Sequence, residues 1–241
     1  MKTLNFTSHN AADTTDLGEI IGCHIRPGTV IVLSGDLGAG KTHISSAIAA
    51  GLGIEIPVTS PTFAIIKNYP QASPAHPEGG RIPLNHMDLY RLEDPSQLRD
   101  LDIWDTVQPG APAATIIEWG EMFDAVISMA DLIIDIRMAD ATMPASSTEG
   151  SAFNADKRMI ELKSRTERGE ILTDVVSLVL AARAERMAAT TETGNTGNTA
   201  KTCKKSPARD QVYSHSDLNT QSTTAEPKQP IQAVQVECSC D

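Results

Sequence analysis

The sequence is poor in aromatic residues, which make up 4% of its 241 residues, and it contains no long hydrophobic run. Hydrophobic residues still reach 40%, so a core can form, but its side chains must be mainly aliphatic. No apolar segment approaches the roughly 20 residues that a membrane-spanning helix needs. Residues 7–16 are polar where a signal peptide would have an apolar region. We therefore expect a cytoplasmic protein without a membrane span.

Basic residues are scarce as well. The chain has 20 Lys and Arg against 31 Asp and Glu, which gives a formal net charge of -11. Proteins that coat nucleic acid neutralise its phosphates with Lys and Arg. The charge therefore argues against a protein that coats nucleic acid, and it leaves open a protein that serves a nucleic-acid enzyme indirectly, through a partner.

The four cysteines do not form a disulfide framework, because only Cys23 lies in the part expected to fold. Cys238 and Cys240 have no further ligands nearby for a closed metal site. A reducing cytoplasm is the natural compartment for such a chain.

The composition changes near residue 187. From Ala188 onward polar residues dominate, and Tyr213 is the only aromatic residue. Such a segment cannot bury enough apolar surface to offset the entropy lost on ordering. We expect a folded domain over residues 1–186 and a disordered polar C-terminal tail over residues 187–241.

Segments of strand and helix character alternate within residues 1–186. Short apolar runs predict buried strands at 30–33, 114–117 and 132–136, and a later strand at 159–163. Segments 63–69 and 82–87 are expected to pair across a Pro- and Gly-rich loop. Helices are expected at 11–24 with Ser8 or Asn10 as cap, at 41–51, at 95–101 with Asp94 as cap, and at 172–186. Residues 138–156 are expected to form a loop. This alternation predicts an α/β fold with a central, mostly parallel sheet flanked by helices.

The motif G-x-x-x-x-G-K-[ST] is matched at every position by Gly35, Asp36, Leu37, Gly38, Ala39, Gly40, Lys41 and Thr42. The glycines let backbone N–H groups wrap around phosphate oxygens. Lys41 reaches the β- and γ-phosphates, and the Thr42 hydroxyl binds Mg²⁺. The N-terminus of the following helix favours the same anion. The motif predicts a P-loop NTPase-type fold that binds ATP and Mg²⁺.

A P-loop also needs an acidic residue from a neighbouring strand to complete its Mg²⁺ site. Glu118 follows the apolar run at 115–117, and Asp88 ends the more polar segment at 85–87. Either acid fits this role by pattern alone. The apolar segment favours Glu118 as the metal ligand, which leaves Asp88 to orient or deprotonate the attacking water.

Together the motifs resemble the TsaE (YjeE) family of small bacterial ATPases that support tRNA threonylcarbamoyladenosine synthesis. The phosphate loop is followed by S-P-T-F at 60–63, H-M-D-L-Y-R-L at 86–92 and I-E-W-G-E at 117–121. The resemblance covers residues 3–186, and the tail has no counterpart in it. Gly120 stands where the family pattern has proline.

The resemblance implies an ATPase that works with a TsaB–TsaD pair, in which TsaD transfers a threonylcarbamoyl group to an adenosine next to the anticodon. Thr42 and Glu118 resemble the Mg²⁺ ligands, and Lys41 with the loop backbone resembles the phosphate cradle. Asp88 resembles a carboxylate needed for hydrolysis. Residues 60–63, with Thr62, resemble a switch near the γ-phosphate, and Trp119 resembles an aromatic residue beside the nucleotide.

Several residues also have plainer interpretations. Thr62 either senses the γ-phosphate or starts a strand after the turn at Pro61. His86 either shuttles a proton or is a hydrogen-bonded strand residue, and Trp119 either stacks near the nucleotide or belongs to the core. Tyr90 and Arg91 either orient Asp88, face a partner, or pack.

Two other functions share the same motif. A small-molecule kinase would need a lid with several arginines, and the chain offers scattered ones such as Arg91 and Arg99. A non-catalytic module would use the nucleotide only to gate docking. Because no arginine finger is evident near the loop, we expect an ATPase that is slow without its partners.

Overall fold

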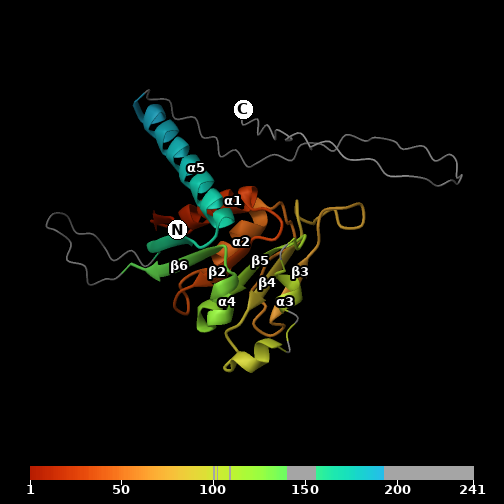
Figure 1. Cartoon of the computed structure of the whole chain (residues 1–241). Coiled ribbons are helices and arrows are strands. Elements are labelled where there is room, and N and C mark those ends of the chain that lie inside the picture. The colour runs from red at the N-terminus through yellow and green to blue at the C-terminus, as the bar shows by residue number, and fades with distance from the viewer. Residues whose placement is uncertain (100, 102, 109, 140–155, 193–241) are drawn as a thin grey trace, which may run out of the picture. The chain divides into compact units, whose positions relative to one another are not determined.

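The computed structural model describes residues 1–99, 101, 103–108, 110–139 and 156–192. Seven strands form one sheet in the order β1-β7-β6-β2-β5-β4-β3 (Figure 1). The strands are β1 (Thr3–Ser8), β2 (Val30–Ser34), β3 (Ile66–Tyr69), β4 (Leu84–Asp88), β5 (Ala114–Glu118), β6 (Leu132–Met138) and β7 (Arg158–Ser164). The helices are α1 (Ala11–His24), α2 (Lys41–Gly51), α3 (Ile103–Thr106), α4 (Asp124–Met129) and α5 (Glu167–Glu192), with 3₁₀ turns η1 (Pro95–Arg99) and η2 (Gly120–Met122).

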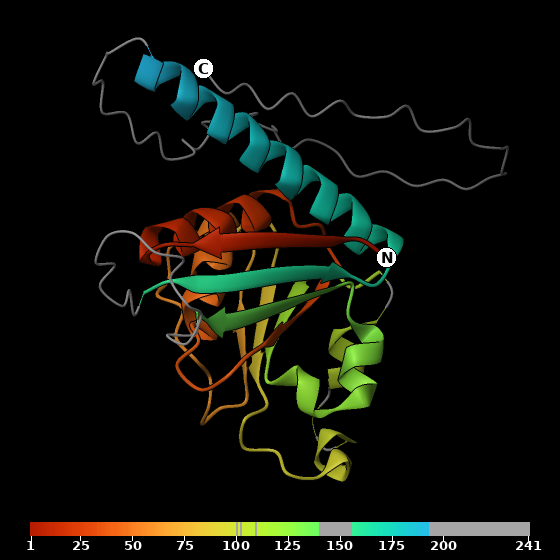
Figure 2. The same ribbon diagram turned by 90° about the vertical axis from the view of Figure 1, so that its left-hand side faces the viewer.

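The centre of the sheet is parallel. β2 pairs in parallel with β5 and β6, and β4 pairs in parallel with β5. The outer strands are antiparallel: β7 lies between β6 and β1, and β3 pairs with β4. The antiparallel β1, β7 and β6 lie side by side in Figure 2. The predicted α/β fold with a central parallel sheet flanked by helices is confirmed.

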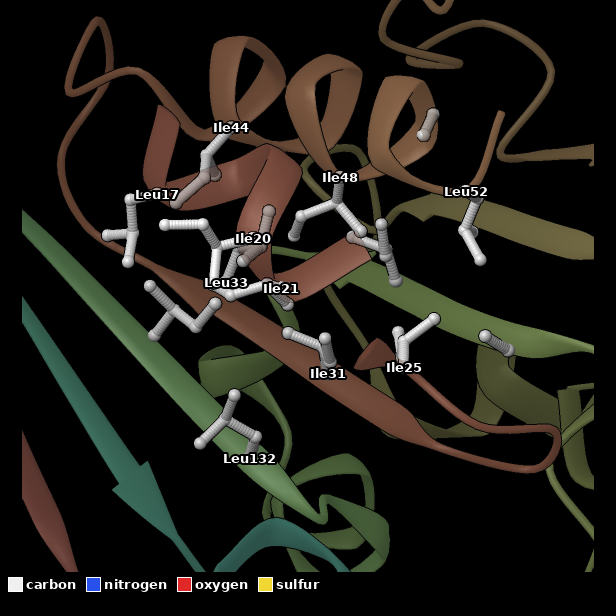
Figure 3. Packing of buried hydrophobic residues seen from close by; sticks show 14 of the residues in the cluster. Leu17, Ile20, Ile21, Ile25, Ile31, Leu33, Ile44, Ile48, Leu52 and Leu132 are labelled. Carbon is white, nitrogen blue, oxygen red and sulfur yellow. The ribbon is translucent and has the colours of Figure 1, made fainter. Parts of the chain in front are cut away.

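Both faces of β2 are covered, which explains why its sequence is continuously apolar. Ile31 and Leu33 pack with α1 and α2 in one core cluster, which Figure 3 shows from close by. Val30 and Val32 belong to a second cluster on the opposite face, together with Val126 of α4. Helices on both faces therefore fix the strand from which the phosphate loop leaves.

Helices α1 and α2 approach each other through glycine. A Cβ atom placed on Gly22 would lie 2.1 Å from the carbonyl oxygen of Ile48, and one on Gly18 would lie 2.4 Å from the Cβ of Ala47. Real Cβ contacts are never this short, so larger residues would push the helices apart. This contact holds α2, whose first residue is Lys41, against the rest of the first core cluster.

Helix α5 starts at Glu167, five residues before the expected start at 172. Thr166 caps it, since its hydroxyl oxygen accepts the N–H of Gly169 at 3.2 Å. That hydroxyl also donates to the carboxylate of Asp131, which accepts the backbone N–H of Val30 at 3.0 Å. The start of α5 is thus tied to β2 and to Asp131, the residue before β6, by contacts between residues distant in sequence.

The structure also differs from expectation at other element ends. α5 continues to Glu192, past the expected start of the tail at 187, because Ala188 and Ala189 extend its helical pattern. The remaining tail, 193–241, and residues 140–155 of the expected loop lie outside the described residues. The expected helix at 95–101 is a shorter 3₁₀ turn. β1 and the short helices α3 and α4 were not expected. None of the described helices is long and apolar enough to cross a membrane.

We predict that Gly22→Ala lowers the free energy of unfolding by about 1–3 kcal/mol, which is typical of overpacking. Helix propensity alone would raise stability by up to about 1 kcal/mol, since Ala favours helix more than Gly. The sign of the change therefore separates the two effects. Chemical denaturation of both proteins measures it, and an increase in stability would contradict the close helix contact.

Candidate functional site

The phosphate loop connects β2 to α2. Gly38 and Gly40 have φ angles of +80° and +112°, in the region that favours glycine, and nothing lies within 4 Å of a Cβ built on either. Gly40 directly precedes α2, whose first-turn N–H groups have no helical partners. The loop thus combines an open backbone with a helix N-terminus, which are the two features of phosphate-binding loops in general.

The Lys41 ammonium is already positioned in the loop. Its Nζ donates to the carbonyl oxygens of Gly35 at 2.5 Å and Asp36 at 2.9 Å. A lysine has three N–H donors, so one remains for a phosphate oxygen. The ammonium also lies 3.5 Å from the centroid of the Trp119 ring. Burial lowers the pKa of Lys41, and the surrounding acids, with Glu121 first among them, oppose that shift.

Glu118 sits at the end of β5, buried beside the start of α2. Its Oε2 accepts the Thr42 hydroxyl at 3.0 Å, and its Oε1 accepts the Ser45 hydroxyl at 3.2 Å. Nε2 of His86 lies 2.8 Å from Oε1, so His86 also contacts Glu118.

The residues present fit Mg²⁺. Thr42 and Glu118 offer a hydroxyl and a carboxylate oxygen next to each other. Mg²⁺ is commonly held by one or two carboxylates together with substrate phosphates and water. No group of three His, Cys, Asp or Glu residues that would hold a metal occurs in the described part of the chain. Phosphate oxygens would therefore have to supply part of the coordination.

Asp88 ends β4, next to Glu118 in register. Its Oδ2 accepts the Thr62 hydroxyl at 2.7 Å and also the Ser60 hydroxyl. Its Oδ1 accepts the backbone N–H of Tyr90 at 3.1 Å. Asp88 therefore joins the end of the sheet to the segment at 60–63.

Trp119 forms the turn after β5. Its φ of +62° is unusual for a residue other than glycine, and it marks local strain. The ring lies 5.0 Å from that of Tyr90, and it packs partly against the second core cluster. Trp119 thus contacts both the core and Lys41. A Cβ atom built on Gly120 would lie 2.9 Å from side-chain atoms of both Val126 and Val32.

Sequence reasoning missed several residues around the loop. The Glu121 carboxylate accepts the Gly35 N–H at 3.3 Å. Ser45 holds Glu118 together with His86, which was already a candidate from the sequence, and Arg158 donates from Nε to the Ala39 carbonyl at 3.0 Å. Glu121 lies in the motif at 117–121, and Ser45 lies one turn after Lys41. These positions relative to the motifs could have identified both residues. Arg158 lies on β7, far from the loop in sequence, so no local pattern pointed to it.

The structure brings most of the candidate residues together at one end of the sheet and leaves others apart. Lys41, Thr42, Asp88, Glu118 and Trp119 surround the loop through the contacts above. Phe63 is 88% exposed, and the Arg91 guanidinium lies 4.2 Å from its ring centroid. Arg99 belongs to η1. Cys238 and Cys240 lie outside the described residues.

Comparison with known proteins identifies a family whose members resemble this chain. The family model described as threonylcarbamoyl adenosine biosynthesis protein TsaE matches residues 8–146. The tRNA threonylcarbamoyladenosine biosynthesis protein TsaE of Bacillus subtilis is 37% identical over 139 residues, which cover 58% of this chain and 80% of that protein. The protein of the same name from Treponema pallidum is 34% identical over 131 residues, which cover 54% and 89%.

A solved structure agrees. The crystal structure of Bacillus subtilis YdiB superposes with a TM-score of 0.50 at 27% identity and covers 73% of this chain and 95% of that chain. The family model spans the phosphate loop and both acids, Asp88 and Glu118. This chain therefore belongs to the TsaE family of tRNA threonylcarbamoyladenosine biosynthesis proteins.

Proposed function

We propose that the protein is a cytoplasmic ATPase required for the N6-threonylcarbamoyladenosine modification of tRNA. It binds and hydrolyses Mg-ATP to support a TsaB–TsaD-type threonylcarbamoyl transfer complex. The observation that carries the proposal is the convergence of Lys41, Thr42, Glu118 and Asp88 on one phosphate loop, in a chain of the TsaE family.

Ground-state binding is assigned to Lys41, the loop amides and the Thr42–Glu118 pair. Lys41 directs an ammonium donor at phosphate oxygens, and such charge-assisted bonds are among the stronger ones. The hydroxyl of Ser45 and the ring of His86 keep the Glu118 carboxylate turned toward Thr42. Mg²⁺ held by Thr42 and Glu118 would offset the negative charge of the nucleotide phosphates.

Hydrolysis is assigned to Asp88. It ends the strand beside Glu118, and the hydroxyls of Ser60 and Thr62 hold one of its oxygens. Once those hydroxyls turn to another acceptor, the carboxylate oxygen is released to orient or deprotonate a water molecule. Phosphoryl transfer depends mostly on such positioning and on charge, so Asp88 acts on the transition state rather than on binding.

An exposed aromatic surface beside the site supports docking to a protein partner. Phe63 and Tyr90 are 88% and 48% exposed, and the Arg91 guanidinium lies over the Phe63 ring. Aromatic residues and arginine are enriched at the centres of protein interfaces. The net charge of -11 argues against direct binding of tRNA phosphates and favours contact with RNA through that partner.

The overall proposal is tested by measuring phosphate release from ATP with the protein alone, with a TsaB–TsaD-type complex, and with tRNA and the threonylcarbamoyl donor added. We expect slow release by the protein alone, faster release with the complex, and modified tRNA only when all are present. Transfer of phosphate to a small acceptor would indicate a kinase instead. Binding of ATP without release under any condition would indicate a nucleotide-gated docking module.

We predict that Lys41→Ala weakens ATP binding by about ten- to a hundredfold, since hydrogen bonds to charged groups contribute about 1.5–3 kcal/mol. Lys67→Ala on β3 is the control, because that lysine lies outside the loop. Titration with a fluorescent ATP analogue measures both variants. Wild-type affinity in Lys41→Ala would contradict the assignment of the phosphate loop.

We predict that replacing each acid by its amide impairs a different step, Mg²⁺-dependent binding for Glu118 and hydrolysis for Asp88. In Glu118→Gln, Mg²⁺ should no longer increase the affinity for ATP, because the variant lacks the carboxylate that would bind the metal. Asp88→Asn should bind Mg-ATP within about twofold of wild type and lose about a hundredfold or more in hydrolysis rate, as typical of a general base. Titrations with and without Mg²⁺, followed by single-turnover assays, measure this. The opposite pattern would exchange the two roles.

We predict that Phe63→Ala weakens capture of the TsaB–TsaD-type complex by about tenfold or more, as expected for an exposed aromatic anchor. Its ATP affinity should not change, because the ring contacts Arg91 rather than the loop. Leu178→Ala on α5 is the control, since Leu178 is also highly exposed but lies on another element. Equal capture by both variants would remove Phe63 from the docking surface.

A further inference from the structure

Glu121 lies beside the phosphate loop, but the proposed chemistry gives it no role. Its Oε1 accepts the N–H of Gly35 at 3.3 Å. Its Oε2 is buried and has no hydrogen-bond partner. A buried oxygen without a hydrogen-bond partner destabilises an ionised carboxylate. The position of Glu121 beside the loop therefore calls for an explanation.

The turn after β5 fixes where this carboxylate lies. Trp119 adopts a φ of +62°, and Gly120 packs against Val32 and Val126. The turn therefore has little freedom to swing away from the loop. Trp119 places its ring against Lys41, and Glu121 places its carboxylate at the first residue of the loop.

The surroundings of Glu121 act on its pKa in opposite directions. Burial raises the pKa of Glu121, and Asp135 on β6 raises it further. The N–H groups of Glu121 itself and of Gly35, and the Lys41 ammonium, act in the opposite direction. In turn, Glu121 is the acid that most strongly favours the charged form of Lys41, ahead of Glu118, Asp88 and Asp36.

We propose that Glu121 is an internal counter-anion of the phosphate loop. Without nucleotide its carboxylate offsets the charge of Lys41. When nucleotide phosphates bind, a proton from solvent adds to the carboxylate and leaves a neutral carboxylic acid. The inference rests on the proposed function, because it concerns the same nucleotide site, and it names a residue whose charge weakens nucleotide binding there.

Electrostatics explains why Glu121 should take up a proton when nucleotide binds. Phosphate oxygens bring negative charge to Lys41, and nearby negative charge disfavours an ionised carboxylate. A protonated carboxyl also gains an O–H donor, which the partnerless Oε2 can carry. The complex therefore holds more protons than the free protein. Its affinity for nucleotide should fall as the pH rises between the pKa of Glu121 in the free protein and its higher pKa in the complex, and level off outside that range.

The test compares the full-length wild type with Glu121→Gln. The amide oxygen of glutamine can still accept the Gly35 N–H, so the variant removes the charge and keeps the contact. Calorimetric titration with Mg-ATP, in buffers of different ionisation enthalpy, measures affinity and proton uptake from pH 5.5 to 8.5. ATP itself titrates in this range, so the difference between the two proteins isolates Glu121. Glu93→Gln, an exposed acid elsewhere, is the control.

We expect Glu121→Gln to bind Mg-ATP about tenfold more tightly than wild type at the alkaline end, which corresponds to a shift of one pKa unit. The difference should shrink at the acidic end, and the variant should take up fewer protons. Carboxyl ¹³C NMR of wild type with labelled glutamate checks the same point without relying on a variant. The Glu121 signal should move toward the protonated position when Mg-ADP is added.

Equal or weaker binding by Glu121→Gln with unchanged proton uptake would overturn the inference and leave the proposed function standing. A Glu121 carboxyl signal that stays at the ionised position with nucleotide bound would do the same. If the wild type bound no Mg-ATP at all, the inference and the proposed function would both be overturned, so the two failures are distinguishable.

Discussion

The candidate site depends on one alignment, in which three parallel strands end at the same level of the sheet. Leu33 at the end of β2 pairs with Glu118 of β5, and Glu118 pairs with Asp88 of β4. Residues paired in register on neighbouring strands point to the same face of the sheet, and the carboxyl ends of parallel strands lie at one end of it, so both acids lie beside the loop that follows β2. A shift of one residue in either pairing would turn an acid to the other face. The apolar side chains on both faces of β2 and β5 therefore position the chemistry as well as stabilise the fold.

The sequence predicts the centre of this arrangement well and its periphery poorly. Buried strands such as β2 are continuous apolar runs, and the phosphate loop is a local motif, so both can be recognised without a structure. β1 pairs with β7 across 150 to 160 residues, and α5 starts where Thr166 meets Asp131. Contacts of that kind have no local signal. Glu121 was visible in the motif at 117–121, but its position beside Lys41 follows from the turn at Trp119 and not from spacing.

Two residues with positive φ flank the acids, and neither is glycine. Ile65 has a φ of +63° and Trp119 has a φ of +62°. The carbonyl of Ile65 accepts the N–H of Asp88 at 2.9 Å, and Trp119 directly follows Glu118. A β-branched residue rarely adopts this conformation. The strain is held by the surrounding hydrogen bonds and packing, so the acids are positioned by the folded sheet rather than by flexible loops.

Lys41, Glu118 and Asp88 already have hydrogen-bond partners within the protein. Lys41 contacts two carbonyls, Glu118 accepts two hydroxyls and contacts His86, and Asp88 accepts two hydroxyls. On the proposed function, Mg-ATP would exchange these internal bonds for bonds to phosphate and metal. Since such an exchange yields only a small part of the gross bond energy, the number of contacts overstates the affinity. The gains and losses of all these groups combine in the binding free energy. A carboxylate facing added phosphate charge opposes binding, whereas the hydroxyls and the ammonium around it favour binding.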